Sequence, residues 1–143
     1  MKIQVAFVAA AIALSGCSTT GLSGGRTTAP AGGGLATPAA PETIISAMDG
    51  GLIGGSIGSN LSNSDRRTAL QAEYRALEYT PAGKAVDWQG SSGVSGSVTA
   101  AQPYRVGSQD CRQYTQTVIQ DGQSKIARGT ACRNSDGSWT PLT

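Results

Sequence analysis

The side chains of this sequence that are best suited to covalent chemistry are its three cysteines, Cys17, Cys111 and Cys132. A cysteine can be acylated, bind a metal, act as a nucleophile or form a disulfide. The chain has no histidine, so the commonest general base and the usual activator of a cysteine nucleophile are missing. The 9 Asp and Glu residues are dispersed and form no local cluster that resembles a metal loop. We therefore expect no catalytic residue, no metal site and no cofactor.

Cys17 follows a segment with the pattern of an export signal. Residues 1–16 contain one cation, Lys2, then an apolar run and two small residues. The apolar run is too short for a spanning helix and is typical of a signal peptide. The one-letter run LSGC, which ends at Cys17, resembles the lipobox of bacterial lipoproteins at every position. This resemblance implies that residues 1–16 are removed and that Cys17 is acylated; the alternative is an ordinary secretory signal followed by a chance cysteine.

A lipidated Cys17 would anchor the chain permanently. Each buried methylene contributes about 0.8 kcal/mol, and two or three acyl chains exceed the marginal binding of one chain. Ser18 follows the cysteine, and by analogy with lipoprotein sorting in double-membraned bacteria it implies the outer membrane, on its periplasmic or surface-exposed side. Residues 17–43 are rich in Thr, Gly, Ala and Pro and cannot bury a core. We expect them to form a lipidated, flexible and disordered tether.

Residues 44–61 contain glycines at helical spacing, although glycine disfavours helices. One helical face would carry small residues, the pattern that lets helices pack closely in a membrane. Eighteen residues span roughly 27 Å as a helix, barely a bilayer core, and Asp49 would cost about 2.5 to 3.5 kcal/mol inside it. We predict a glycine-zipper segment that associates with membrane or with itself, with a flexible linker as the alternative. The glycines concerned are Gly50, Gly51, Gly54, Gly55 and Gly58.

Residues 64–143 are predicted to form one small α+β domain. Residues 62–65 offer N-cap side chains, and a helix should follow over 66–79. The apolar stripe of this helix is expected to pack against the rest of the domain; binding to a partner is the alternative. From residue 84 onward the apolar period becomes two, which indicates an antiparallel sheet of about 4–5 strands.

The longest predicted hairpin fixes a position for the two remaining cysteines. Asp121-Gly122 favours a two-residue type I′ turn, and facing residues around that turn have numbers that add to 243. Cys111 and Cys132 satisfy this rule at a non-hydrogen-bonded pair, where Cα atoms approach to about 4.5 Å. In an oxidising compartment we therefore predict a Cys111–Cys132 disulfide. A redox pair is the alternative, but CxxC spacing is missing.

The charge pattern does not suggest a nucleic-acid footprint, so we expect no nucleic-acid partner. The chain has 11 Lys and Arg against 9 Asp and Glu, and the hairpin cations alternate between faces, Arg112 and Lys125 on one and Arg128 on the other. The membrane is the expected partner, and self-association through the glycines would give a homo-oligomer. We expect the larger aromatic side chains, Trp88, Tyr114 and Trp139, to be core residues rather than a ligand platform.

Three segments carry a family resemblance. The sequences ALEYTPAGKAVDWQ at 76–89, CRQYTQTVIQDG at 111–122 and ARGTACRNSDGSWTPL at 127–142 resemble the C-terminal domain of the rickettsial-type 17-kDa surface antigen family. The resemblance implies an outer-membrane lipoprotein with a glycine zipper before its domain and no established catalytic activity. The expected function is that of a surface lipoprotein with a structural role in the envelope. The alternatives are a lipid-anchored binding module, for instance an inhibitor of an extracytoplasmic hydrolase, and an enzyme, which would need a pocket with a perturbed carboxylate or lysine.

Overall fold

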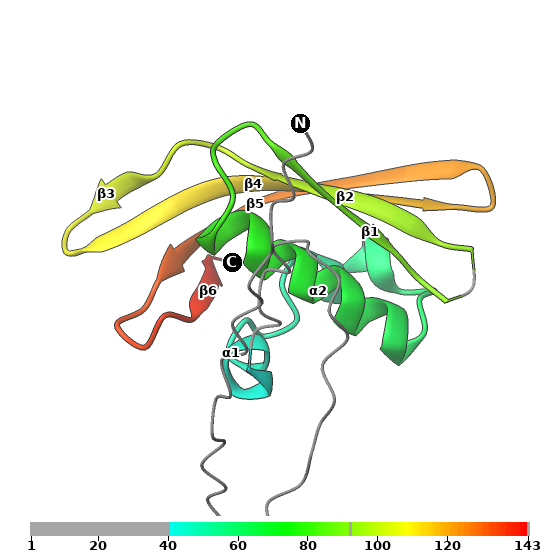
Figure 1. Ribbon diagram of the computed structural model, residues 1–143, viewed down its shortest axis with the longest axis horizontal. Coiled ribbons are helices and arrows are strands. Elements are labelled where there is room, and N and C mark those ends of the chain that lie inside the picture. Colours follow the sequence, from blue (N-terminus) through cyan, green and yellow to red (C-terminus); the bar gives the residue numbers. More distant parts are fainter. Residues whose placement is uncertain (1–40, 92, 143) are drawn as a thin grey trace, which may run out of the picture. The chain divides into compact units, whose positions relative to one another are not determined.

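The computed structural model of this chain describes residues 41–91 and 93–142 (Figure 1). The predicted signal peptide, Cys17 and the predicted tether up to residue 40 lie outside the described residues, so the structure does not test these predictions. The described residues form an α+β fold with one long helix, an antiparallel sheet and one disulfide.

The long helix, α2 (Asn63–Glu78), begins three residues earlier than the helix predicted over 66–79. Its N-cap is Ser62, whose hydroxyl oxygen accepts the Asp65 N–H at 3.1 Å, and Asp65 places a negative charge in the first turn. The helix therefore starts at the first available cap of the predicted group. It ends at Glu78, with Tyr79 as its C-cap, ahead of the Thr80-Pro81 pair.

The sheet is larger than expected, with six antiparallel strands instead of four or five. Strands β1, β2, β4, β5 and β6 lie side by side in that order, and β3 pairs with β4. The two short strands, β3 and β6, extend one end of the long hairpin. The bounds are β1 (Ala85–Gln89), β2 (Ser95–Ala100), β3 (Tyr104–Val106), β4 (Gln109–Gln120), β5 (Gln123–Arg133) and β6 (Trp139–Leu142).

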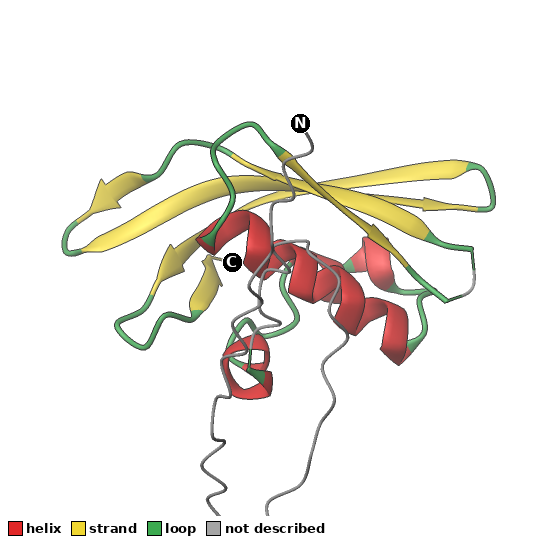
Figure 2. Cartoon of the chain, in the orientation of Figure 1, coloured by secondary structure: helices red, strands yellow, loops and turns green. Residues whose placement is uncertain are grey.

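The helices cover one face of the sheet, and the core lies between the two layers (Figure 2). Helix α2 contributes its small and apolar face, including Ala69, Ala72, Ala76 and Leu77, which are at most 1% exposed. The predicted packing of the helix stripe against the domain is thereby confirmed. The three large aromatic residues expected in the core are also buried: Trp88, Tyr114 and Trp139.

The long hairpin has the predicted register. Asp121 and Gly122 both have positive φ, 52° and 74°, as a type I′ turn requires. Cys111 faces Cys132, and the two are joined by a disulfide with a Cα–Cα distance of 4.0 Å. Turn chemistry and cysteine spacing together were sufficient to predict this bridge.

Residues 44–61 differ from the single helix that their glycine spacing predicts. They fold into α1 (Glu42–Ser46) and two turns of 3-10 helix, η1 (Leu52–Gly54) and η2 (Ser56–Gly58). The chain turns at residues 49–51, which have φ angles of 47°, 80° and 56° and so cannot continue a right-handed helix. Along the described parts of the chain, no helix has the length and apolar character needed to cross a membrane.

The apolar side chains of this segment belong to the core of the domain. They lie in the same buried cluster as the residues of α2 and of the sheet. The folded unit therefore begins before residue 64, the predicted boundary, because these side chains are buried only by packing on the domain. The buried members are Ile45, Met48, Ile53, Ile57 and Leu61. A role of the glycines in self-packing or at a membrane stays a prediction.

Candidate functional site

The predicted site residues that the structure describes fall into two places, the glycine-rich segment and the disulfide end of the sheet. We call residues 49–55 the glycine loop. This loop is held by Glu73, which projects from the middle of α2 and is fully buried. One carboxylate oxygen, Oε2, accepts the Leu52 N–H and the other, Oε1, accepts the Ile53 N–H, both at 3.0 Å. The bonds satisfy donors at the start of η1 that have no partner within the turn.

Two of the predicted zipper glycines are needed for close approach inside the domain. A Cβ at Gly51 would overlap the Glu73 carboxylate and lie 2.8 Å from Leu70 Cδ1. A Cβ at Gly58 would overlap the carbonyl of Ile53. The glycine pattern that predicts helix packing in a membrane is thus used here to bring the loop backbone against α2 and against itself. The other three, Gly50, Gly54 and Gly55, have more space around them.

The environment of Glu73 alters its acid–base behaviour. Burial raises the pKa of its carboxyl group to about 7, and the N–H donors of Leu52 and Ile53 limit this rise. The Tyr114 side chain on β4 faces the same carboxyl group, and burial together with the Glu73 charge raises the pKa of the Tyr114 hydroxyl. A carboxyl group with a pKa near 7 is suited to general acid–base catalysis. Since Glu73 has 0% exposure, however, it contacts no substrate in this conformation, and its role is to hold the glycine loop.

A buried cation holds the other end of α2. Arg112, on the helix-facing side of β4, is 6% exposed. Its Nη1 donates to the carbonyl oxygens of Ala76 at 3.0 Å, Leu77 at 2.7 Å and Thr80 at 3.2 Å, and its Nε donates to Ala101 at 2.8 Å. The Ala76 and Leu77 carbonyls belong to the last turn of α2, where they have no partner within the helix and carry the negative end of its dipole. The guanidinium group therefore fixes the end of α2 to the sheet.

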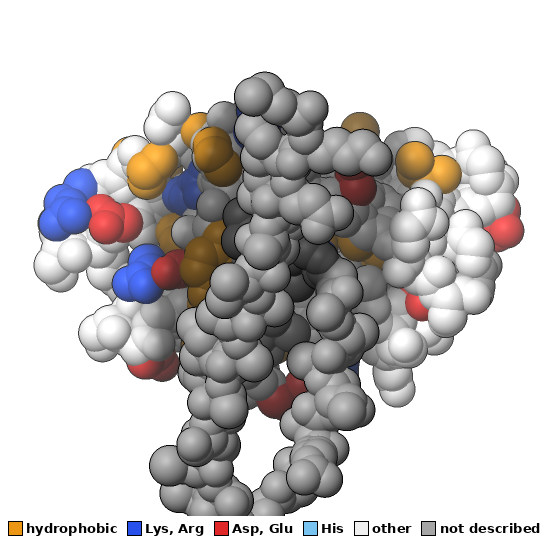
Figure 3. Space-filling model, viewed as in Figure 1, with side chains coloured by type: hydrophobic (Ala, Val, Ile, Leu, Met, Phe, Trp, Pro, Cys, Tyr) orange, Lys and Arg blue, Asp and Glu red, His pale blue; other side chains and the backbone are white. Residues whose placement is uncertain are grey.

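The C-terminal strands are joined to α2 by a second charged contact. Arg133 donates two hydrogen bonds to the Glu78 carboxylate, at 2.8 and 2.7 Å, and Trp139 Nε1 donates to the same carboxylate at 2.8 Å. Near the β3 end of the molecule, Figure 3 shows Lys and Arg side chains next to Asp and Glu side chains. An exposed ion pair between Arg105 and Asp110, at 2.8 Å, also lies there. The charges at this end are paired and do not form a patch of one sign.

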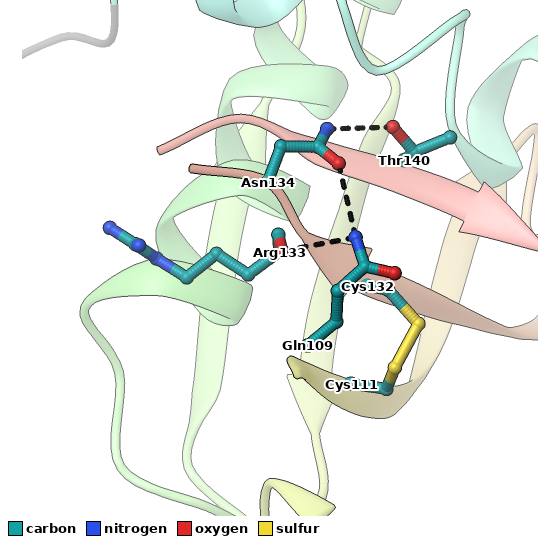
Figure 4. Close-up of a disulfide and its surroundings, with 6 residues drawn as sticks. All are labelled: Gln109, Cys111, Cys132, Arg133, Asn134 and Thr140. Carbon is teal, nitrogen blue, oxygen red and sulfur yellow. Dashed lines mark hydrogen bonds between the residues drawn. A yellow bond between two sulfur atoms is a disulfide. The ribbon is translucent and has the colours of Figure 1, made fainter. Parts of the chain in front are cut away.

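The disulfide lies beside a loop that is ordered by side-chain hydrogen bonds (Figure 4). Asn134 Nδ2 donates to Ser138 Oγ at 2.9 Å and to Thr140 Oγ1 at 2.8 Å. Gln109 Nε2 reaches across from β4 and donates to the Arg133 carbonyl oxygen and to Asn134 Oδ1, both at 3.4 Å. These hydrogen bonds therefore hold the loop at 134–138 in one conformation at the disulfide end of the sheet.

Sequence reasoning does not predict the anchoring roles of Glu73 and Arg112, and it names Arg112 only as a cation of the hairpin. Glu73 and Arg112 occupy positions where helical or strand periodicity places them on an inner face, and that placement was the available signal. Neither residue has a local motif, because each meets its partners only after α2 packs on the sheet. Throughout residues 41–91 and 93–142, no group of three or more His, Cys, Asp or Glu side chains is arranged to hold a metal ion.

Comparison with known proteins finds a family similar to part of this domain. Residues 75–140 match the model of a family described as the 17 kDa outer membrane surface antigen. This region contains the disulfide, Arg112, Glu78 and the whole sheet except the end of β6. No solved structure matches the chain.

Similar curated proteins come from Rickettsia, and each is named "17 kDa surface antigen". The protein of Rickettsia bellii is 42% identical over 85 residues, which cover 58% of this chain and 54% of the relative. The protein of Rickettsia felis is 44% identical over 81 residues, or 55% and 51% of the two chains. This chain therefore spans about half the length of the curated relatives it matches. Over residues 75–140, this chain is therefore similar to the 17 kDa outer membrane surface antigen family.

Proposed function

We propose that this chain is a non-catalytic lipoprotein of the outer membrane, anchored through Cys17 and displaying its domain as a surface antigen. The observation that carries the proposal is the LSGC motif at residues 14–17, placed ahead of a domain similar to a family described as an outer membrane surface antigen. The name of the relatives, surface antigen, supports the same location.

The contacts made by the buried charged residues of the domain support a structural role rather than a catalytic one. Its buried charged groups, Glu73 and Arg112, are hydrogen-bonded to backbone groups of neighbouring elements and hold those elements together. The disulfide ties the ends of β4 and β5. We propose a structural role in the envelope, in which the tether at 17–43 sets the distance of this scaffold from the bilayer.

The anchor is tested by comparing wild type with Cys17→Ser in cells fed an alkyne-labelled palmitate. Wild type should incorporate the label and remain with carbonate-washed membranes, while Cys17→Ser, exported through a cleavable non-lipoprotein signal, should do neither. The double variant Cys111→Ser/Cys132→Ser is the matched control, because it removes two cysteines but leaves Cys17. Label on Cys17→Ser would contradict the assignment of the acylated residue.

The same experiment addresses the glycine-rich segment. If Cys17→Ser loses the label but stays with washed membranes, residues 44–61 leave their docked position and anchor the chain. If it is released, the lipid is the sole anchor and the glycines serve the packing seen around Glu73. The envelope role is tested in a deletion strain, where unchanged sensitivity to detergent and to osmotic shock would contradict it.

A binding module is the second candidate, and the ordered loop at 134–138 favours it. A loop that is held by Asn134 and by the nearby disulfide loses little entropy when it binds a partner. An inhibitor of an extracytoplasmic hydrolase would use such a loop. The full chain should then capture one stoichiometric hydrolase from an envelope extract, and Asn134→Ala should release it; capture of no hydrolase would remove this candidate.

A further inference from the structure

The face of the sheet that points away from α2, here called the outer face, carries an unusual share of the exposed apolar side chains. On β4 the even-numbered residues 112, 114, 116 and 118 face the helix side and are buried. The odd-numbered residues and their cross-strand partners therefore form the outer face. By the strand register, five large hydrophobic residues that are 43% to 57% exposed lie on this face: Tyr104, Val106, Ile119, Ile126 and Leu142.

The outer face is also nearly free of charge. Over all six strands, register assigns it two charged side chains, Asp87 on β1 and Arg128 on β5. Neither makes an ion pair within the described part of the chain. The middle of the face is a band of hydroxyl groups, and a shallow groove of about 550 Å³ lies over it. The residues of this band that line the groove include Thr99, Thr115 and Thr130.

The two charges lie on β1 and β5, the first and last of the four neighbouring strands β1, β2, β4 and β5. Asp87 belongs to the row of facing residues that contains Thr117 and Ile126, while Arg128 belongs to the next row, with Thr115. Adjacent rows on one face are about 6.8 Å apart along the strands. A two-fold axis parallel to the strands and between β2 and β4 would place β1 of one copy over β5 of the other. Each Asp87 would then lie one row from the partner's Arg128, within reach of the long arginine side chain.

We propose that the outer face is a homodimer interface, packed sheet against sheet on the same face of a second copy, with Asp87 paired to the partner's Arg128 twice. Such an interface is isologous, and aligned packing of two sheets is a standard arrangement. The six strands contain 41 residues. At about 3.4 Å along and 4.8 Å across per residue, the face measures roughly 670 Å², close to the approximately 800 Å² per partner of a standard interface.

The chemistry of the face favours a second copy over other partners. An anionic bilayer surface or a nucleic acid would select for several cations, but the face has one cation and one anion. Because the face has one charge of each sign on different strands, two copies related by a two-fold axis can bring the anion of each copy near the cation of the other. The low charge and the exposed apolar residues match the composition of interface cores. The proposal does not depend on the lipid anchor or on the docking of the glycine loop.

The test uses the chain from residue 17 onward with Cys17→Ser, so that no acyl chain drives association. Sedimentation equilibrium should detect a dimer at micromolar concentration. Thr115→Arg, at the centre of the face, should give a monomer with unchanged near-ultraviolet circular dichroism, because a buried unpaired charge opposes association. A charge reversal away from the face, Arg105→Asp, is the matched control and should leave the dimer unchanged.

Charge reversals test the pairing itself. Asp87→Arg and Arg128→Asp should each weaken the dimer by about tenfold or more, since each places like charges together twice, and the double reversal should recover most of the wild-type affinity. A monomeric wild type, a dimer that tolerates Thr115→Arg, or a double reversal no tighter than the single ones would each overturn the proposal. Binding of wild-type chain to lipid vesicles that Thr115→Arg abolishes would also overturn it, by assigning the face to a bilayer.

Discussion

The backbone of Gly51 lies directly against the carboxylate of Glu73, with no room between them for a Cβ atom. This contact explains why the glycine-rich segment folds onto the domain rather than continuing as a helix. The carboxylate accepts the two N–H groups that follow Gly51, so the close approach and the hydrogen bonds depend on one another. The docked loop in turn allows Ile53 to be buried beside α2.

Gly51→Ala should destabilise the domain by about 2 to 4 kcal/mol, because the new methyl group must displace Glu73 and residue 51 has a φ of 56°. Urea unfolding of the wild type and the variant measures this difference. Gly54→Ala is the matched control, since a Cβ there meets only the Asp49 carbonyl oxygen at 3.9 Å. Equal losses in both variants would show that flexibility of the loop, and not the contact with Glu73, is what the glycines provide.

The raised pKa of Glu73 predicts that stability falls as pH increases through the mildly acidic range. The folded state holds the proton up to a pKa of about 7, whereas the carboxyl group in the unfolded chain loses it near 4.5. The contribution is therefore complete below about pH 4.5 and is lost progressively up to about pH 7, amounting to at most about 3 kcal/mol. The chain has no histidine to titrate in the same window.

Unfolding free energies measured from pH 5 to pH 8 check this effect. Glu73→Gln removes the ionisable group and should flatten the profile over this range, whatever its effect on stability at a single pH. A wild-type profile that is already flat would mean that Glu73 titrates near its ordinary value and that water reaches the loop.

How much of this fold could be predicted depends on how local each determinant is. The helix cap at Ser62, the turn at Asp121-Gly122 and the register that joins Cys111 to Cys132 follow from neighbouring residues, and all are found in the structure. The docking of residues 44–61 follows from Glu73, about 20 positions further along the chain. Glycine spacing is equally consistent with a close approach to a helix in lipid and with one inside a small domain. Local sequence therefore could not decide between them.

The same reasoning explains why the anchoring role of Arg112 was missed. A strand arginine on an inner face is expected to be excluded from a core, since a buried charge is costly unless it is paired. Arg112 is tolerated because the end of α2 presents several carbonyl groups to it. That arrangement exists only once the helix has packed on the sheet, so it leaves no trace in the spacing of residues.

Arg112→Lys should cost about 3 kcal/mol or more in unfolding free energy. A lysine ammonium group cannot reach the four carbonyl oxygens that the guanidinium group binds, and carbonyls left buried without donors are costly. Arg105→Lys is the matched control, because its ion pair with Asp110 is exposed and such pairs contribute about 1 kcal/mol or less. Similar losses in both variants would contradict the assigned role of Arg112.

Glu78 predicts a separate loss of stability at low pH. Hydrogen bonds from Arg133 hold the pKa of the Glu78 carboxyl group below its ordinary value of 4.5, and the Trp139 indole adds to this effect. Its contribution is present above about pH 4.5 and disappears as pH falls below the folded-state pKa. Thermal unfolding between pH 2.5 and pH 5 should show a falling midpoint in wild type and a weaker fall in Glu78→Gln. Parallel curves would assign the acid loss to other carboxylates.

Removal of the disulfide should destabilise the domain without changing its topology. Cys111→Ser/Cys132→Ser opens a loop of about 22 residues, which in the chain-entropy model costs on the order of 3 kcal/mol. The hairpin should still form, because the Asp121-Gly122 turn and the inner face of β4 specify its register independently. Urea unfolding measures the loss, and cross-strand contacts between Tyr114 and Gly129 detected by nuclear magnetic resonance report the register. Wild type unfolded with a reductant present should match the double variant. A shifted register in the variant would mean that the bridge, and not the turn, aligns the two strands.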